Sequence, residues 1–101
     1  MFTTTKIYKR PSTDVAWHID TIPEIPTDIL NSYLAVEQEF EKKKTRVIND
    51  SKPLELEITV NWNDKADYTA YWNKDEVLAY FSKINAYYTA NGGYVGARTT
   101  S

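Results

Sequence analysis

This sequence of 101 residues contains no cysteine, a single histidine and only three glycines. Without cysteine the chain forms no disulfide and has no thiolate to act as a nucleophile or a metal ligand. With His18 as the one histidine, and no GxSxG context around any serine, a Ser–His–Asp triad is not encoded. The glycine cluster at residues 92–96 follows an expected helix, whereas phosphate-binding loops precede one. We therefore predict no catalytic residue, no metal site and no cofactor.

Long hydrophobic runs are also missing. The mean hydropathy is -0.56, with 42% hydrophobic and 26% charged residues, so no segment is apolar enough to span a membrane. The start, MFTTTKIYKRP, lacks the apolar stretch of a secretory signal. The net charge of -2 provides no positive field for nucleic acid. We expect one domain over residues 1–101, located in the cytoplasm, with neither a membrane nor a nucleic acid as partner.

Two segments near the start carry β-type patterns. β-Branched and aromatic residues predict a strand over 2–10, which Pro11 ends because proline donates no ladder hydrogen bond. In the following stretch Val15, Trp17 and Ile19 stand at alternate positions, the pattern of a strand that is buried on one face. We expect a hairpin or one bent strand here, with His18 on its solvated face.

An amphipathic helix is predicted after this region. Apolar residues at helical spacing cover about residues 28–43, and Thr27 is suited to be the N-cap. The basic run of Lys42, Lys43, Lys44 and Arg46 then lies at the helix C-terminus, where positive charge is favourable. A solvated helix end is the simpler interpretation of this run, and an RNA or partner contact is the alternative.

The clearest strand pattern covers residues 54–62, where apolar residues alternate with polar ones over nine positions. The polar face includes Glu55 and Glu57, which we interpret as solvated side chains and not as a catalytic carboxylate pair. Residues 45–49 are β-branched and precede a cluster of turn formers. A register that places Val47 opposite Leu56 predicts a hairpin between the two segments.

Two helices and a short strand are predicted for the rest. Asn63 and Asp64 are suited to cap a helix over about 65–72, and Asn73 with Glu76 forms a capping box for a second helix. The sequence Asn91-Gly92-Gly93 ends that helix, and 94–99 returns as an edge strand. This order predicts an α+β fold, a small antiparallel sheet of four to five strands with helices packed on one face.

Aromatic residues gather in the second half, where nine of the fourteen lie between Trp62 and Tyr94. The stripe through Phe81, Ile84 and Tyr88 is expected to be core. The other tyrosines exceed what a domain of this size buries, so they predict either a protein interface or an aromatic-lined ligand pocket. The candidate ligand or partner residues are Trp62, Tyr68, Tyr71, Trp72, Tyr80, Tyr87 and Tyr88.

The segment from Leu54 to Gly93 resembles the second half of a dimeric α+β barrel protein. The pattern consists of an alternating strand ending in Trp62, a short aromatic helix, and a longer helix with the Tyr87–Tyr88 pair near its end. This ferredoxin-like group includes antibiotic-biosynthesis monooxygenase domains. The resemblance implies a homodimer. It implies no particular chemistry, because members use their own pocket residues, such as a haem-ligating histidine on a helix, and this segment contains no histidine.

Two functions are favoured by the sequence, and a nucleic-acid-binding module comes third. The first is a non-enzymatic protein that acts through protein–protein association, as a homodimer or as an assembly or regulatory component, including phage-encoded virion or accessory proteins. The alternative is a dimeric α+β barrel enzyme or small-ligand binder, with an aromatic-lined pocket between the sheet and the helices. An aromatic cavity in the structure favours the second.

Overall fold

The sheet is built around the first strand of the chain. The computed structural model describes residues 2–100, and the chain runs strand, helix, two strands, two helices and two short strands. Strand β1 pairs with β3, β3 pairs with β2, and β4 and β5 pair with the other edge of β1, all antiparallel. The elements are β1 (Phe2–Lys9), α1 (Thr27–Glu39), β2 (Lys44–Lys52), β3 (Glu55–Trp62), α2 (Lys65–Trp72), α3 (Asp75–Ala90), β4 (Tyr94–Val95) and β5 (Thr99–Thr100).

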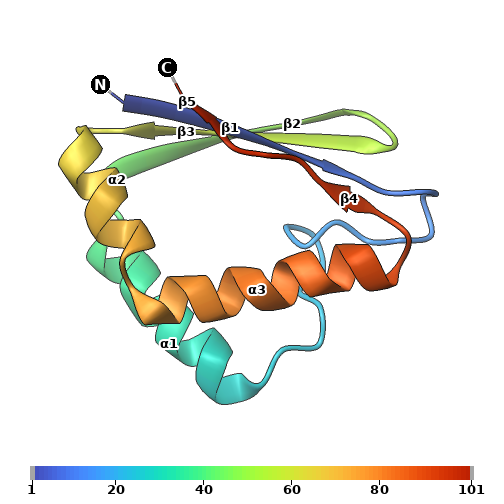
Figure 1. The fold of residues 1–101 in the computed structure, drawn as a ribbon, viewed down its shortest axis with the longest axis horizontal. Helices are drawn as coiled ribbons and strands as arrows, with labels where there is room; N and C mark the ends of the chain where they lie inside the picture. Colours follow the sequence, from blue (N-terminus) through green and yellow to red (C-terminus); the bar gives the residue numbers. More distant parts are fainter. Residues whose placement is uncertain (1, 101) are drawn as a thin grey trace.

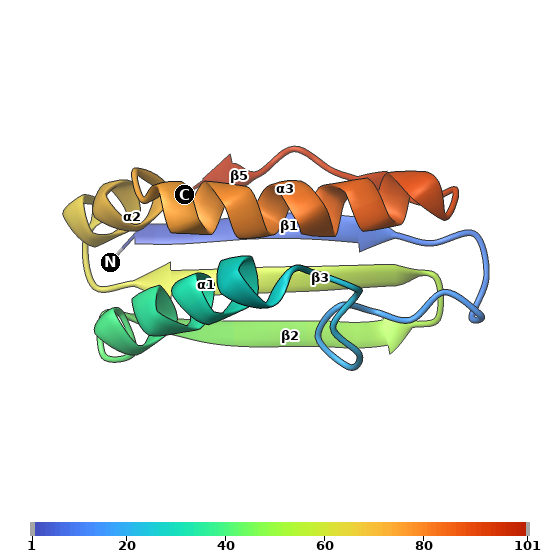
Figure 2. The ribbon, with the colours of Figure 1, turned by 90° about the horizontal axis from the view of Figure 1, so that it is seen from below.

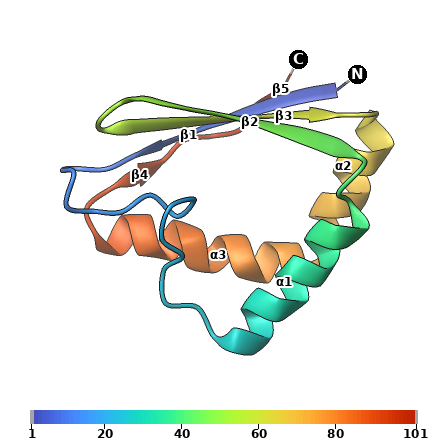
Figure 3. The ribbon, with the colours of Figure 1, turned by 180° about the vertical axis from the view of Figure 1, so that it is seen from behind.

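This order of strands, β2-β3-β1-β4, with helices in the two crossovers is the ferredoxin-like βαββαβ arrangement. All three helices lie on one face of the sheet, and the other face is left uncovered (Figures 1 and 3). Seen from the helix side, α3 lies in front of β1, and α1 lies in front of β2 and β3 (Figure 2). The predicted α+β fold, its sheet and its resemblance to the ferredoxin-like group are confirmed. No helix within residues 2–100 is long and apolar enough to cross a bilayer.

The core lies between the inner face of the sheet and the helices. On β3 the alternating residues Leu56, Ile58 and Trp62 are buried, and they meet Val77, Ile84 and Tyr88 of α3. Because side chains alternate along a strand, the partners Thr3, Thr5, Thr59 and Asn61 point to the uncovered face. The predicted stripe of α3 is confirmed, with Phe81 only half-buried at its edge.

The helix ends follow the predicted capping in part. Asp64 caps α2, since its carboxylate accepts a hydrogen bond from the Asp67 backbone at 2.9 Å. Gly92 ends α3 with φ of 77°, a conformation that glycine adopts without steric cost. The predicted capping box is wrong, because Lys74 is the N-cap of α3 and its side chain makes no capping hydrogen bond. Thr27 is likewise already helical, and Pro26 precedes it as N-cap.

The predicted strand around Val15–Ile19 is wrong. This part of the chain forms turns and bends, in which Trp17 and His18 are buried. Other side chains replace the ladder of hydrogen bonds that a strand would supply. Arg10 lies over the Trp17 ring at 4.2 Å and donates to the Val15 carbonyl at 2.8 Å, and Tyr87 donates to the Ala16 carbonyl at 2.7 Å.

The β2–β3 hairpin is confirmed, but its predicted register is wrong. Val47 lies opposite Thr59, and Ile48 lies opposite Ile58. Strand β2 extends to Lys52, and an irregularity between Asn49 and Lys52 absorbs the extra residues of the connection. This register turns Val47 outward, 52% exposed, and turns Lys44 and Arg46 toward the helices.

The basic run is therefore divided between two elements. Helix α1 ends at Glu39, four residues earlier than predicted, and the chain turns through residues 40–43 into β2. Lys42 and Lys43 are exposed in this turn, whereas Lys44 and Arg46 belong to the edge strand. The run does not form a solvated helix end, because Lys44 and Arg46 belong to the edge strand and line the space beneath the helices, with Lys44 half-buried and Arg46 exposed.

Candidate functional site

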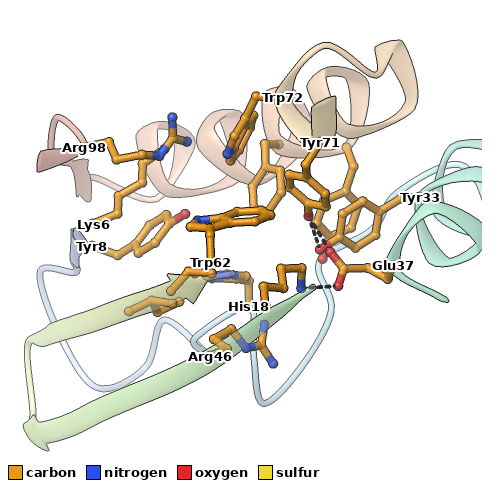
Figure 4. Close-up of a pocket in the computed structure, with 15 residues that line it drawn as sticks. Lys6, Tyr8, His18, Tyr33, Glu37, Arg46, Trp62, Tyr71, Trp72 and Arg98 are labelled. Carbon is orange, nitrogen blue, oxygen red and sulfur yellow. Dashed lines mark hydrogen bonds and ion pairs between the residues drawn. The ribbon is translucent and has the colours of Figure 1, made fainter. Parts of the chain in front are cut away.

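A pocket of about 80 Å³ lies between the inner face of the sheet and helices α1, α2 and α3. This is room for several water molecules or a compact organic molecule. Residues from β1, β2, β3, all three helices, the connector after β1 and the tail before β5 contribute to it (Figure 4). Its walls combine seven aromatic side chains with four cations, one carboxylate and the only histidine.

The aromatic walls come mainly from the residues singled out in the sequence. Trp62, Tyr71, Trp72 and Tyr80 line the pocket together. Tyr80 stacks against Tyr33 of α1 with ring centroids 3.7 Å apart and planes within 4°. The ring centroids of Trp62 and Tyr71 are 5.2 Å apart. Flat, rigid rings of this kind present a large apolar surface with little rotamer freedom to lose on binding.

The other three candidates lie outside the pocket and support it. The ring of Tyr68 packs against that of Trp62, with the ring centroids 5.5 Å apart. The Tyr68 hydroxyl accepts a hydrogen bond from Arg98. Tyr87 and Tyr88 hold the connector between β1 and α1 through hydrogen bonds to Ala16 and His18. The predicted set is thus divided between four lining residues and three that position the lining.

A hydrogen-bonded network closes one side of the pocket. Lys44 donates to the Glu37 carboxylate at 2.7 Å, and Tyr71 donates to the same carboxylate and lies 3.3 Å from the Tyr33 hydroxyl. Burial acts to raise the pKa of Glu37, but hydrogen bonds from Lys44 and Tyr71 outweigh it and hold that pKa below its ordinary value. Burial raises the pKa of Tyr71 and of Tyr33, so both phenols stay protonated. Glu37 and Lys44 therefore neutralise each other.

His18 lies at another side of the pocket, where the sequence pattern predicted a solvated side chain. It is only 6% exposed, because the chain bends inward here instead of running as a strand. Its backbone N–H donates to the Tyr88 hydroxyl at 2.9 Å, and its Nδ1 lies 2.7 Å from that oxygen. Burial, followed by the charges of Arg46 and Lys6, lowers the pKa of His18 to about 4. The imidazole is therefore neutral at physiological pH, and Nδ1 accepts the Tyr88 proton, which leaves Nε2 as a donor.

Three further cations, Lys6, Arg46 and Arg98, line the pocket (Figure 4). Arg98 lies 3.9 Å from the Trp72 ring, and it donates to the Tyr68 hydroxyl at 3.3 Å. Burial, and then the charge of Arg98, lower the pKa of Lys6. Within residues 2–100, no carboxylate lies close enough to any of the three to form an ion pair.

The Tyr8 hydroxyl lies among these cations. Tyr8 is 2% exposed, lines the pocket, and makes no side-chain hydrogen bond to any residue in the range 2–100. Burial raises its pKa, while the charges of Arg98 and Arg46 act in the opposite direction. A buried phenol usually has a hydrogen-bond partner, so this hydroxyl is available to a molecule in the pocket.

Comparisons with known families, sequences and structures found a match among the solved structures only. No family model matches the chain, and no curated protein sequence matches it. A solved structure described as an antibiotic biosynthesis monooxygenase aligns with 98% of this chain and 93% of that one, with a TM-score of 0.46 and 11% sequence identity. That protein bears the name of the group that residues 54–93 resemble. At this score and identity the alignment transfers no residue role to this chain.

The remaining candidates from the sequence lie away from the pocket. Glu55 and Glu57 are on the uncovered face of the sheet, where Glu55 pairs with Lys52 at 3.1 Å and Lys9 at 3.9 Å. Among residues 2–100, no three side chains of the types that bind metals come together. The chemistry of the described chain is therefore concentrated in the pocket.

Several pocket residues were missed in the sequence, and the strand pattern contains the signal that identifies them. Lys6 stands between Thr4 and Tyr8, which share the inner face of β1 and are 4% and 2% exposed. On β2, Lys44 and Arg46 share a face with Ile48 and lie opposite Trp62 and Val60. A cation at a position where the alternation requires an apolar residue indicates a polar site inside the fold.

Proposed function

We propose that this chain binds a small, flat organic molecule in the pocket between the sheet and the helices. The observation that supports this most strongly is the combination of aromatic walls with polar groups whose hydrogen-bonding capacity is not fully used within residues 2–100. Small-molecule sites are typically concave, largely apolar, and equipped with a few placed polar groups. Tyr8, Lys6 and Arg98 supply such groups, and the stacked rings supply the apolar part.

The placement of the tyrosines favours a pocket over an exposed aromatic interface. Tyr71, Tyr80 and Tyr88 are 4%, 6% and 0% exposed, so the domain buries more of them than its size suggests. Tyr94 is the one aromatic residue among the exposed large hydrophobic side chains of the described chain. Most of the tyrosines therefore do not lie on an exposed surface that a protein partner could contact.

The three tryptophans allow a direct test by NMR titration. Trp62 and Trp72 line the pocket, whereas Trp17 is buried elsewhere, against Arg10 and Tyr88. On titration with benzamide and naphthamide, we expect the indole N–H signals of Trp62 and Trp72 to shift and that of Trp17 to stay. If all three move together, or if none moves with any flat molecule tested, charged or neutral, the pocket is not a binding site for flat molecules.

A matched pair of variants provides the control. Val60→Phe fills the pocket with a larger side chain and should abolish the shifts, at a stability cost of about 1–3 kcal/mol for overpacking. Val47→Phe places the same side chain on the uncovered face of the neighbouring strand and should leave the shifts unchanged.

Self-association is a second proposal, and the uncovered face of the sheet supports it. No helix covers this face (Figure 3), and Val47 is 52% exposed on it, beside threonine pairs such as Thr5 and Thr59 at 3.2 Å. Monomeric proteins usually cover a sheet face that carries apolar side chains or make it strongly charged.

Analytical ultracentrifugation tests this second proposal. We expect a dimer at micromolar concentration that Val47→Lys dissociates, while Leu78→Lys, an equally exposed apolar position on α3, leaves it intact. A wild-type protein that sediments as a monomer would rule the proposal out and leave ligand binding unaffected.

A further inference from the structure

The charged side chains that line the pocket say more about its ligand than the shape of the pocket does. Of its four cations, Lys44 is matched by Glu37 at 2.7 Å. Lys6, Arg46 and Arg98 have no acidic partner within residues 2–100, and Glu37 is the only carboxylate in the lining. The pocket thus holds three positive charges that the described part of the fold does not balance.

Each of the three cations acts on another group in the lining of the pocket. The charges of Arg98 and Arg46 both reach Tyr8, that of Arg98 also reaches Lys6, and those of Arg46 and Lys6 reach His18. Lys6 extends over the Tyr8 ring, with its ammonium 5.5 Å from the ring centroid. The Tyr8 hydroxyl, a donor without a partner in residues 2–100, therefore lies within reach of the charges of Arg98 and Arg46, and the Lys6 ammonium lies over the ring of the same tyrosine.

Arg98 is held in place by contacts that leave most of its donors unused. Its guanidinium stacks on Trp72, and one nitrogen donates to Tyr68. Its remaining N–H groups make no hydrogen bond within residues 2–100. An arginine fixed in this way presents a preorganised fork of donors, the geometry that recognises carboxylates and phosphates.

Lys6 and Arg98 are half-buried, and Arg46 is exposed on the edge strand. Like charges gathered around one pocket without counterions oppose folding, so their presence there calls for a compensating function. From these observations we infer that the ligand is an organic acid whose anionic group lies beside the Tyr8 hydroxyl, among Lys6, Arg46 and Arg98. The aromatic walls then hold the planar part of the molecule. This inference rests on the proposed binding function and adds the chemical class of the ligand.

The test compares acids with their neutral amides. Benzoate and naphthoate, each paired with its amide, are titrated into the wild-type protein by calorimetry, with the Trp62 and Trp72 signals followed by NMR. We expect each acid to bind about tenfold more tightly than its amide, the size of effect that charge-assisted hydrogen bonds produce. Equal affinity for acid and amide would overturn the inference and leave pocket binding intact. Absence of any shift by either class would instead refute the binding proposal itself.

Variants locate the anionic group. Lys6→Met, Arg98→Met and Tyr8→Phe should each bring the affinity for the acids close to that for the amides, with amide binding unchanged. Lys9→Met, on the uncovered face of the same strand as Lys6, and Tyr94→Phe, at an exposed tyrosine, should leave the preference at about tenfold. If the outer substitutions reduce the preference as much as the inner ones, it arises from overall charge and the assigned site is wrong.

A measurement of stability distinguishes a role of Lys6 in ligand binding from a purely structural role. Because Lys6 is half-buried beside Arg98, its removal relieves repulsion. We expect Lys6→Met to unfold at an equal or higher temperature than the wild-type protein while losing the preference for acids. A clear fall in the unfolding temperature would show that Lys6 serves the fold, and would contradict its assignment to a ligand.

Discussion

Replacing Lys44 with methionine is expected to lower the free energy of unfolding by about 3 kcal/mol near neutral pH. Lys44 and Glu37 are 14% and 26% exposed, and their ion pair is 2.7 Å long. Without Lys44, the Glu37 carboxylate keeps its hydrogen bond from Tyr71 but is left partly buried with no positive partner. A buried charge that loses its partner destabilises a protein more than the intact pair stabilised it. Chemical denaturation followed by tryptophan fluorescence measures the change.

Two further variants make this experiment specific. The double variant Lys44→Met with Glu37→Gln removes both charges and should recover more than half of the lost stability. Lys74→Met breaks the pair of Lys74 with Glu39, which is 3.5 Å long and whose side chains are 37% and 53% exposed, so it should cost less than about 1 kcal/mol. Equal losses for Lys44→Met and Lys74→Met would mean that the pocket pair is as solvated as a surface one.

Acidification should destabilise the protein through its single histidine by about 3 kcal/mol. The pKa of His18 is lowered from 6.5 to about 4 by burial and by Arg46 and Lys6. Between these two pH values the unfolded chain carries a proton on this residue that the folded chain does not. Stability therefore falls as the pH decreases from 6.5 toward 4, and this contribution is constant above and below that window.

Because His18 is the only histidine in the sequence, its contribution to the pH dependence of stability can be separated from that of the carboxylates. A His18→Gln variant is expected to be less stable at neutral pH, but the difference from the wild-type protein should shrink as the pH falls through this window. NMR titration of the imidazole reports the same property directly, with a midpoint near 4. A midpoint near the ordinary value of 6.5 would show that the ring is solvated, and would remove it from the pocket lining.

The fold could be predicted from the sequence wherever a pattern extended over many residues. The alternating positions ending at Trp62 and the helical stripe through Ile84 each gave the right element and the right buried face, except that Leu54 lies before the strand begins and is 44% exposed. The short alternation around Trp17 did not, because three apolar residues at alternate positions also suit an irregular loop that buries one indole. That loop is held by Arg10 and Tyr87, which are distant interactions that no local pattern contains.

The pocket could be predicted only in its aromatic half. Trp62, Tyr71, Trp72 and Tyr80 were singled out because the aromatic residues are concentrated in one stretch. The polar half depends on the register of β2, and the odd offset between predicted and observed pairing reverses which face of that strand points inward. Arg98 reaches the pocket only because the tail of the chain pairs with β1, a contact between segments about ninety residues apart.

The same pairing of distant segments has a consequence for folding kinetics. Strand β1 is central in the sheet, yet its hydrogen-bonded neighbours lie far along the chain, as the separations of 58 residues between Thr3 and Asn61 and 94 between Thr5 and Thr99 show. Closing such long loops requires a large loss of chain entropy before any stabilising contact forms, which slows folding. During synthesis, β1 leaves the ribosome long before β3 or the tail exists. For that interval it is an unpaired strand, open to chaperones and to other chains.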